Sequence, residues 1–173
     1  MIVEDGDGIE NANSYVTLDE AISYCNDRGL TFAASPSSLG DAALIRASAA
    51  IDARYGASFP GYRKSGRDQG LQWPRAAAYD SEGWLIAEDI VPNEVIQATI
   101  EAAVREFAVP NSMMPDLERG GEIQSIRAGS VGITYASGAS AKTKFTLIDG
   151  LISNVLSGNG SSSNGVFGNA VRG

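Results

Sequence analysis

The sequence predicts a mainly α fold: a compact helical bundle with a small β-hairpin, extended loops and a flexible C-terminal tail. Three observations lead to this class. Apolar residues recur at helical spacing in four segments, one of which opens with a capping box. A later segment alternates apolar and polar residues with period two, which is typical of a strand. The chain ends in GNGSSSNGVFGNAVRG, a segment of low complexity.

Two helices are predicted in the first third of the chain. In TLDEAISYCNDRG, Thr17 is a good N-cap, Glu20 completes a capping box, and Gly29 is a natural stop. A second, longer helix is predicted from about Leu39 to Tyr55, where small and apolar residues form one stripe. The stripe consists of Leu44, Ala47, Ser48, Ile51 and Tyr55. Its many alanines indicate that a neighbouring helix approaches closely.

A loop region is predicted after the second helix. Pro60 and three glycines break the helical spacing over residues 57–70. The segment QWPRAAAYDSEGWLI follows, and it holds both tryptophans of the chain. Because a proline pushes the preceding residue towards extended geometry, Trp73 is not expected to be helical.

A tight turn is predicted inside this tryptophan-containing segment. Asp80 and Gly83 suit the first and last positions of a type I turn. Residues 76–79 and 84–86 would then be the two arms of a small extended hairpin or loop pair. We expect Trp73, Pro74 and Arg75 to fix the loop against the bundle, and Trp84 to cap the hairpin.

The third long helix is predicted within VPNEVIQATIEAAVREFAVP. Pro92 suits its first turn, and Pro110 helps to end it. The predicted inward seam consists of Ile96, Ile100, Ala103 and Phe107, flanked by Val95, Thr99 and Ala102.

A hairpin and a short helix complete the predicted fold. Period-two alternation through Val131, Ile133 and Tyr135 indicates a strand, and its partner arm is expected near Ile123–Arg127. TLIDGLISNVLSG reads as a last short helix. Its predicted inward residues are Leu147, Leu151, Ile152 and Val155.

A chain of 173 residues suits one domain. We expect a helical domain over residues 1–157, with the hairpin near 122–136, followed by a flexible tail over 158–173. The tail carries three apolar residues, Val166, Phe167 and Val171. They could dock on a partner, or they could belong to a disordered terminus.

Composition excludes several kinds of active site. The chain has no histidine and one cysteine, which rules out Ser–His and Cys–His nucleophile pairs and zinc sites built on those residues. GASAKT and GNGSSS both depart from the glycine spacing of nucleotide-binding loops. We therefore expect no enzymatic activity, no cofactor and no metal. No stretch has the length of a membrane helix, and the N-terminus is not a signal peptide, so synthesis in the cytoplasm and no membrane partner are expected.

One segment is locally basic. Five cations and one acid give +4 within a chain of net charge −8. The cations are Arg54, Arg63, Lys64, Arg67 and Arg75, against Asp68. Tyr62 and Trp73 interleave with them. Such a segment can grip a single nucleic-acid strand, dock on an acidic protein surface, or be a solvated loop whose aromatic residues anchor it to the core. The candidate partner-binding residues are Arg63, Lys64, Arg67, Trp73, Arg75, Val166, Phe167 and Val171.

The chain resembles, over nearly its whole length, a family of small tailed-phage proteins. The resemblance lies in the order of QWPRAAAYDSEGWLI, LERGGEIQSIRAGSVGITYASG and KFTLIDGLISNVL. Members are often labelled DnaT-like single-stranded DNA-binding proteins, and they resemble head–tail connectors, also called adaptors.

The connector resemblance implies a structural protein of the virion neck. It would form a ring of twelve copies beneath the portal, joining capsid to tail. Its partners would be its own copies, the portal and a downstream neck or tail-completion protein, and packaged DNA would pass without specific binding. The alternative is a single-stranded DNA-binding accessory protein of replication. The net charge and the aromatic fraction of 8% speak against this alternative, and the basic–aromatic segment speaks for it.

Overall fold

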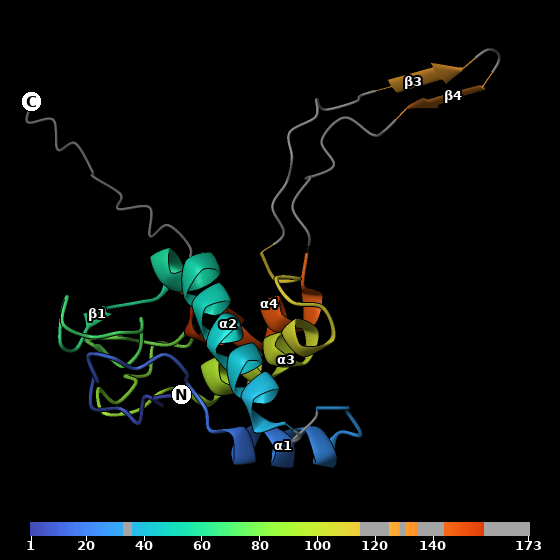
Figure 1. Ribbon diagram of the computed structural model, residues 1–173. Helices are drawn as coiled ribbons and strands as arrows, with labels where there is room; N and C mark the ends of the chain where they lie inside the picture. Colours follow the sequence, from blue (N-terminus) through green and yellow to red (C-terminus); the bar gives the residue numbers. More distant parts are fainter. Residues whose placement is uncertain (33–35, 115–124, 129–130, 135–143, 158–173) are drawn as a thin grey trace, which may run out of the picture.

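Four α-helices form the frame of the protein. The computed structural model describes residues 1–32, 36–114, 125–128, 131–134 and 144–157. Its helices are α1 (Leu18–Asp27), α2 (Ser37–Tyr55), α3 (Asn93–Ala108) and α4 (Thr146–Ile152), with 3-10 helices η1 (Gly56–Ser58) and η2 (Ser153–Val155). Helices α2 and α3 pack against each other, and α4 packs on α3 (Figure 1). The predicted mainly α class is confirmed.

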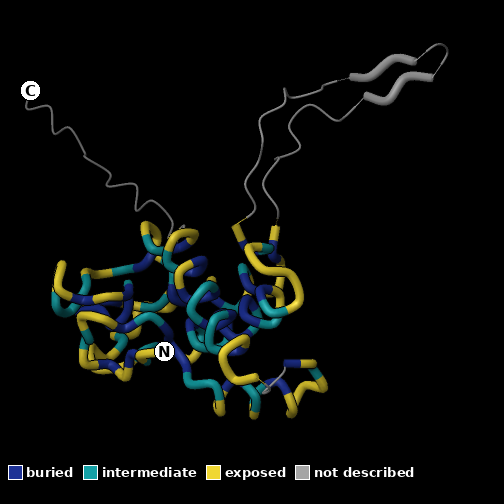
Figure 2. Tube along the Cα trace, in the orientation of Figure 1, coloured by how far each residue is buried: buried dark blue, intermediate teal, exposed yellow. Residues whose placement is uncertain are grey.

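Small residues let α2 and α3 come close together. Alanines are completely buried on both helices, and alanine permits close approach of helix backbones. They are Ala43 and Ala47 on α2, and Ala98, Ala102 and Ala103 on α3. Leu44, Ile51 and Ile100 fill the space beside them. The interior of the helical frame is accordingly buried in Figure 2.

Local signals account for most of the helix ends. The capping box predicted at Thr17 and Glu20 is present, and α1 begins at the next residue after Thr17. Helix α2 begins at Ser37, two positions before the predicted Leu39. Pro92 is the N-cap of α3 and not a residue of its first turn.

Burial corrects two of the predicted helix faces. In α4, Leu147 is 56% exposed, and Ile148 takes the inward position because only the face of Ile148 and Ile152 is turned towards the core. In α3, the fully buried face is centred one position away from the predicted seam, so that Ile96 and Phe107 are only partly buried. A buried Glu106 belongs to this face. It forms an ion pair with Arg46 at 2.9 Å, which offsets the cost of its burial.

Two short antiparallel ladders complete the described structure. In the first, β1 (Tyr62–Arg63) pairs with β2 (Arg75–Ala76). In the second, β3 (Ser125–Ala128) pairs with β4 (Val131–Thr134), which confirms the predicted hairpin with slightly different bounds. The predicted tail over 158–173 lies outside the described residues.

The segments that precede α1 and α3 form a loop layer at one side of the bundle. In Figure 1, the N-terminal segment (blue) and the segment around β1 and β2 (green) lie side by side. The Gly70 N–H donates to the Ile9 carbonyl at 3.0 Å, and Lys64 Nζ donates to the Gly6 carbonyl at 3.0 Å. Within the described ranges, no helix is long and apolar enough to cross a membrane.

Candidate nucleic-acid interface

Three aromatic side chains of the loop layer are exposed to solvent. Tyr62 is 63% exposed, Tyr79 is 52% exposed and Trp84 is 71% exposed. The other aromatic side chains in the described part of the chain are buried or partly buried. Large aromatic surface that is left in water is a common mark of a binding site.

Backbone pairing brings these three residues into one region. Tyr62 on β1 lies opposite Ala76 on β2, and the chain needs only three further residues to reach Tyr79. Tyr79 forms an isolated antiparallel bridge with Leu85, the neighbour of Trp84. The Ile86 N–H donates to the Ala78 carbonyl at 2.9 Å, so the two predicted arms of this small hairpin are confirmed.

The turn between the arms fixes the backbone of Trp84. Asp80 Oδ1 accepts the N–H groups of Glu82 at 3.0 Å and of Trp84 at 2.8 Å. The Gly83 N–H donates to the Asp80 carbonyl at 3.1 Å, which confirms the turn predicted from Asp80 and Gly83. Gly83 has φ +91°, a conformation that favours glycine.

Three cations follow Tyr62 within the same loop segment, at positions 63, 64 and 67. Arg67 is exposed, whereas Arg63 and Lys64 are half-buried and reach loop carbonyls. Lys64, Ala77 and Leu85 line one shallow concave surface of about 500 Å³, together with residues 86–89. We call the set Tyr62, Arg63, Lys64, Arg67, Tyr79 and Trp84 the aromatic–basic surface.

Acidic residues border this surface and limit its positive charge. Asp80 and Glu82 belong to the turn, and Glu88 and Asp89 line the concave surface. Arg54, which the sequence groups with the basic segment, instead forms an ion pair with Asp149 at 3.3 Å. The exposed aromatic groups, more than charge, therefore distinguish this region.

Trp73 and Arg75 lie beneath the surface and not on it. Trp73 has no exposed area, and its ring meets Phe59 edge-on with a centroid distance of 5.6 Å. Arg75 is 7% exposed, and burial lowers the pKa of its guanidinium. It donates to the carbonyls of Pro60 at 2.6 Å and Gly61 at 2.9 Å. The expectation that Trp73 to Arg75 fix the loop against the bundle is confirmed, and their predicted contact with a partner is not supported by this burial.

Gly61 makes this close packing of Arg75 and the β1–β2 ladder possible. Its φ is +65°, and a Cβ at this position would lie 2.2 Å from the Ala76 carbonyl oxygen. Any other residue would push β1 away from β2 and displace Tyr62.

A buried hydrogen-bond network anchors the Gln72–Trp73 backbone to α2. The Tyr15 hydroxyl donates to Asp52 and accepts the N–H groups of Gln72 at 3.0 Å and Trp73 at 3.2 Å. Asp52 Oδ2 accepts the same Gln72 N–H at 2.9 Å. Burial raises the pKa of Asp52 to about 6, against the lowering effect of these hydrogen bonds, and it also raises the pKa of Tyr15. The Trp73–Pro74 peptide bond is cis.

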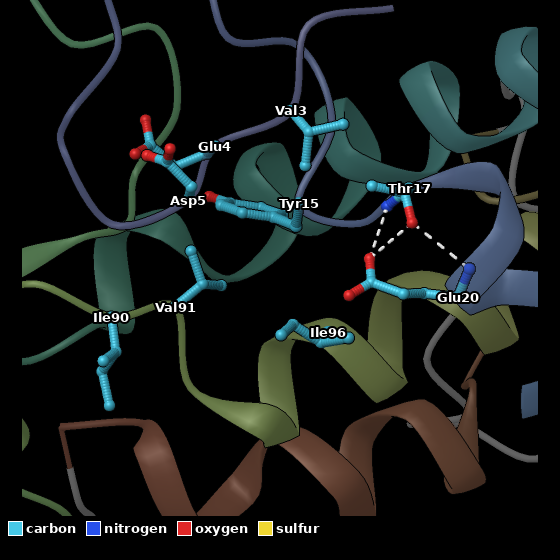
Figure 3. A pocket seen from close by; sticks show the side chains of 9 residues that line it. All are labelled: Val3, Glu4, Asp5, Tyr15, Thr17, Glu20, Ile90, Val91 and Ile96. Carbon is cyan, nitrogen blue, oxygen red and sulfur yellow. Dashed lines mark hydrogen bonds between the residues drawn. The ribbon is translucent and has the colours of Figure 1, made fainter.

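A second cavity, of about 380 Å³, is unsuited to phosphate because its lining is acidic (Figure 3). It includes Glu4, Asp5 and Glu20. The buried Glu4 carboxylate is occupied by the N–H groups of Gly6, Gly8 and Ile9 at 2.8–3.0 Å. Glu20 is engaged in the capping box with Thr17, drawn as dashed lines in Figure 3. These contacts give Glu4 and Glu20 structural roles.

The predicted candidate set contains the three cations of the surface, Arg63, Lys64 and Arg67, but none of its aromatic residues. Tyr62 is noted in the sequence only as interleaving with the cations, and Tyr79 and Trp84 are not among the predicted partner-binding residues. The signal for them is the Asp80–Gly83 turn, because residues that flank a tight turn on a short hairpin have few neighbours to cover them. Val166, Phe167 and Val171 lie outside the described residues. Among the described residues, no cluster of three or more His, Cys, Asp or Glu could hold a metal ion.

Comparison with known proteins corrects the predicted main function. The whole chain, residues 1–173, matches the model of a family described as "Putative DnaT-like ssDNA binding protein". The head–tail connector function, with its virion, neck and ring descriptions, is therefore wrong, and the alternative of single-stranded DNA binding is the better supported one. The predicted partners (the portal and a downstream neck or tail-completion protein) and the predicted location depend on the connector function, and the family match does not test them separately.

Searches of curated proteins and of solved structures found no match. The family is therefore shown by the sequence match alone, and this match extends over every residue of the chain. The chain belongs to the DnaT-like ssDNA binding protein family.

Proposed function

We propose that this protein binds single-stranded DNA through the aromatic–basic surface and that it does so without catalysing a reaction. The observation that carries the proposal is the exposure of Tyr62, Tyr79 and Trp84 within one loop layer that also contains three cations. The family match supports the same activity. Aromatic rings offer stacking platforms to unpaired bases, and each stacked base contributes about 1–3 kcal/mol by alanine substitution.

Stacking selects single strands over duplexes. The bases of a duplex already stack on one another, so they offer no free faces to Tyr62, Tyr79 or Trp84. A duplex would have to be held by phosphate contacts alone. With a net charge of −8 and acidic residues around the surface, this protein is poorly equipped for that mode of binding.

The number of cations limits how much phosphate contacts contribute to the binding free energy. Arg63, Lys64 and Arg67 can neutralise three phosphates at most, and Lys64 already donates to a backbone carbonyl. Stacking therefore supplies most of the affinity in this proposal, and phosphate contacts orient the strand.

The test is a fluorescence anisotropy titration of labelled oligo-dT, with the matching duplex as competitor. Wild-type protein is expected to bind the single strand, and the duplex is expected to compete weakly. Trp84→Ala should weaken binding about 5- to 150-fold, which corresponds to the loss of one stacked base. Leu147→Ala is the matched control, because Leu147 is also an exposed apolar side chain but lies on α4. Equal binding by Trp84→Ala and wild type would contradict the proposal.

A further inference from the structure

We infer that Asn154 is a positioning residue for Trp84: it fastens the Asp80–Trp84 turn to the helical frame and so sets the direction of the exposed indole. The inference rests on the proposed function, because the direction of Trp84 matters only if the indole stacks on a base. It assigns a role in DNA binding to η2, which is more than 60 residues away from the turn in sequence.

Asn154 connects the turn with two elements of the helical frame. Its backbone carbonyl accepts the Ser81 N–H at 2.8 Å, and its side-chain Oδ1 accepts the Ser81 hydroxyl. Its Nδ2 donates to Glu94 Oε1, in the first turn of α3, at 3.3 Å. One side chain thus joins η2, α3 and the turn.

Apolar burial anchors the base of the hairpin, through the buried Ala78 and the partly buried Ile86, but not its tip. Residues 81–84 are all exposed, so that no side chain among them is inserted into the core. The bonds from Asp80 to Glu82 and Trp84 fix the shape of the turn, but they lie within it and cannot set its angle to the bundle. The Ser81–Asn154 contacts cross from the turn to the frame, and we assign the orientation to them.

The amide of Asn154 is suited to this place because it presents an acceptor and a donor at once. The substitution Asn154→Asp would keep the acceptor for Ser81 but would bring a second carboxylate against Glu94. The repulsion between two carboxylates should separate η2 from the first turn of α3 and loosen the turn. Adding Glu94→Gln would then offer an amide donor to the new carboxylate and restore the link with the opposite polarity.

This reversal of polarity provides the test. Asn154→Asp is expected to bind oligo-dT about fivefold more weakly than wild type, which corresponds to the loss of one hydrogen bond. Glu94→Gln alone should bind like wild type, because its amide oxygen can still accept from Asn154. The double variant Asn154→Asp with Glu94→Gln should recover wild-type affinity within about twofold.

A second readout follows the indole directly. Trp73 is completely buried, so iodide should quench mainly Trp84. The iodide-quenchable fluorescence therefore reports on Trp84. Its steady-state anisotropy should fall in Asn154→Asp, because the indole becomes more mobile, and should recover in the double variant. A merely structural role would change the denaturation midpoint without this paired loss and recovery. If Asn154→Asp proves unfolded, Ser81→Ala, which removes only one exposed hydroxyl, takes its place.

The outcomes separate the inference from the proposed function. Loss of binding in Trp84→Ala, with wild-type binding and unchanged indole anisotropy in Asn154→Asp, overturns the role of Asn154 and leaves the proposed function intact. Absence of binding by the wild-type protein overturns the proposed function, and the role of Asn154 in DNA binding falls with it.

Discussion

Asp80 holds the backbone of Trp84 and leaves its side chain free. Asp80 Oδ1 accepts the Trp84 N–H at 2.8 Å, while the indole is 71% exposed. The Asp80 N–H in turn donates to the Trp84 carbonyl at 2.9 Å. A backbone that is already ordered before binding loses little conformational entropy when a base stacks on the indole, and such preorganisation increases affinity.

The first prediction concerns Asp80. Asp80→Ala should weaken oligo-dT binding about fivefold. The turn loses two hydrogen bonds of roughly 1 kcal/mol each, and DNA binding must then order the loosened turn at the cost of about half of this free energy. Asp80→Asn keeps the acceptor Oδ1 and should bind like wild type, measured by the same anisotropy titration. If both variants bind equally weakly, the charge of Asp80 and not its hydrogen bonding is what matters.

The second prediction concerns salt. The three cations can make three phosphate contacts. A plot of the logarithm of the association constant against the logarithm of the salt concentration should therefore have a negative slope that is no steeper than about −2. Arg67→Glu should reduce the magnitude of the slope by about 0.7, because one phosphate contact is lost. Arg28→Glu makes the same charge change on the exposed residue after α1 and should leave the slope unchanged. A slope much steeper than −2 would show that phosphate contacts outside the aromatic–basic surface dominate.

The third prediction distinguishes Trp73 from Trp84. Trp73→Ala leaves a cavity where a fully buried ring meets Phe59, and it should lower the free energy of unfolding by about 3–5 kcal/mol. Trp84→Ala should change this free energy by less than about 0.5 kcal/mol while weakening DNA binding. Urea denaturation followed by circular dichroism measures the first quantity. Comparable destabilisation by the two variants would show that the Trp84 turn packs on the bundle in solution.

The helices are predictable from the sequence because their signals are local. The Thr17–Glu20 capping box and the stripe from Leu44 to Tyr55 each lie within one helix, and both are confirmed. The face of α4 is not, because Leu147 and Ile148 are adjacent, equally apolar residues. Which of the two faces the core depends on the position of α3, and the local sequence of α4 carries no information about that position.

The candidate surface, too, can be predicted from the sequence only as far as it depends on local residues and not on long-range contacts. The basic segment predicts Arg63, Lys64 and Arg67, but the same pattern of charges and interleaved aromatic residues assigns Arg75 and Trp73 to the surface as well. Their burial depends on Phe59, on the carbonyls of residues 60–61 and on the Tyr15–Asp52 pair, all of which are brought together only by the fold. The connector function fails for a different reason, because resemblance to a family does not by itself select among the activities attached to it.

The last prediction concerns the pH dependence of stability and follows from the environment of Asp52. Burial raises the pKa of this carboxyl from 3.8 to about 6, although the Tyr15 hydroxyl, the Gln72 N–H and the charges of Arg75 and Arg63 all act to lower it. Below about pH 4 the group is protonated in both the folded and the unfolded chain. Between about pH 4 and 6 only the unfolded chain releases the proton. The contribution of Asp52 to the free energy of unfolding therefore falls as the pH rises through this window, and it levels off above it.

Asp52→Asn removes this titration and keeps the shape of the side chain. Two pKa units correspond to about 3 kcal/mol, so the difference in free energy of unfolding between Asp52→Asn and wild type should shift by up to that amount in favour of the variant from pH 4 to pH 7. Urea denaturation at intervals of half a pH unit gives this difference directly. Asp27→Asn, at the exposed end of α1, serves as the control for loss of one negative charge. A difference that stays flat with pH would mean that Asp52 is already ionised at pH 4 in the folded protein, and the Tyr15 hydroxyl and Gln72 N–H would then outweigh its burial.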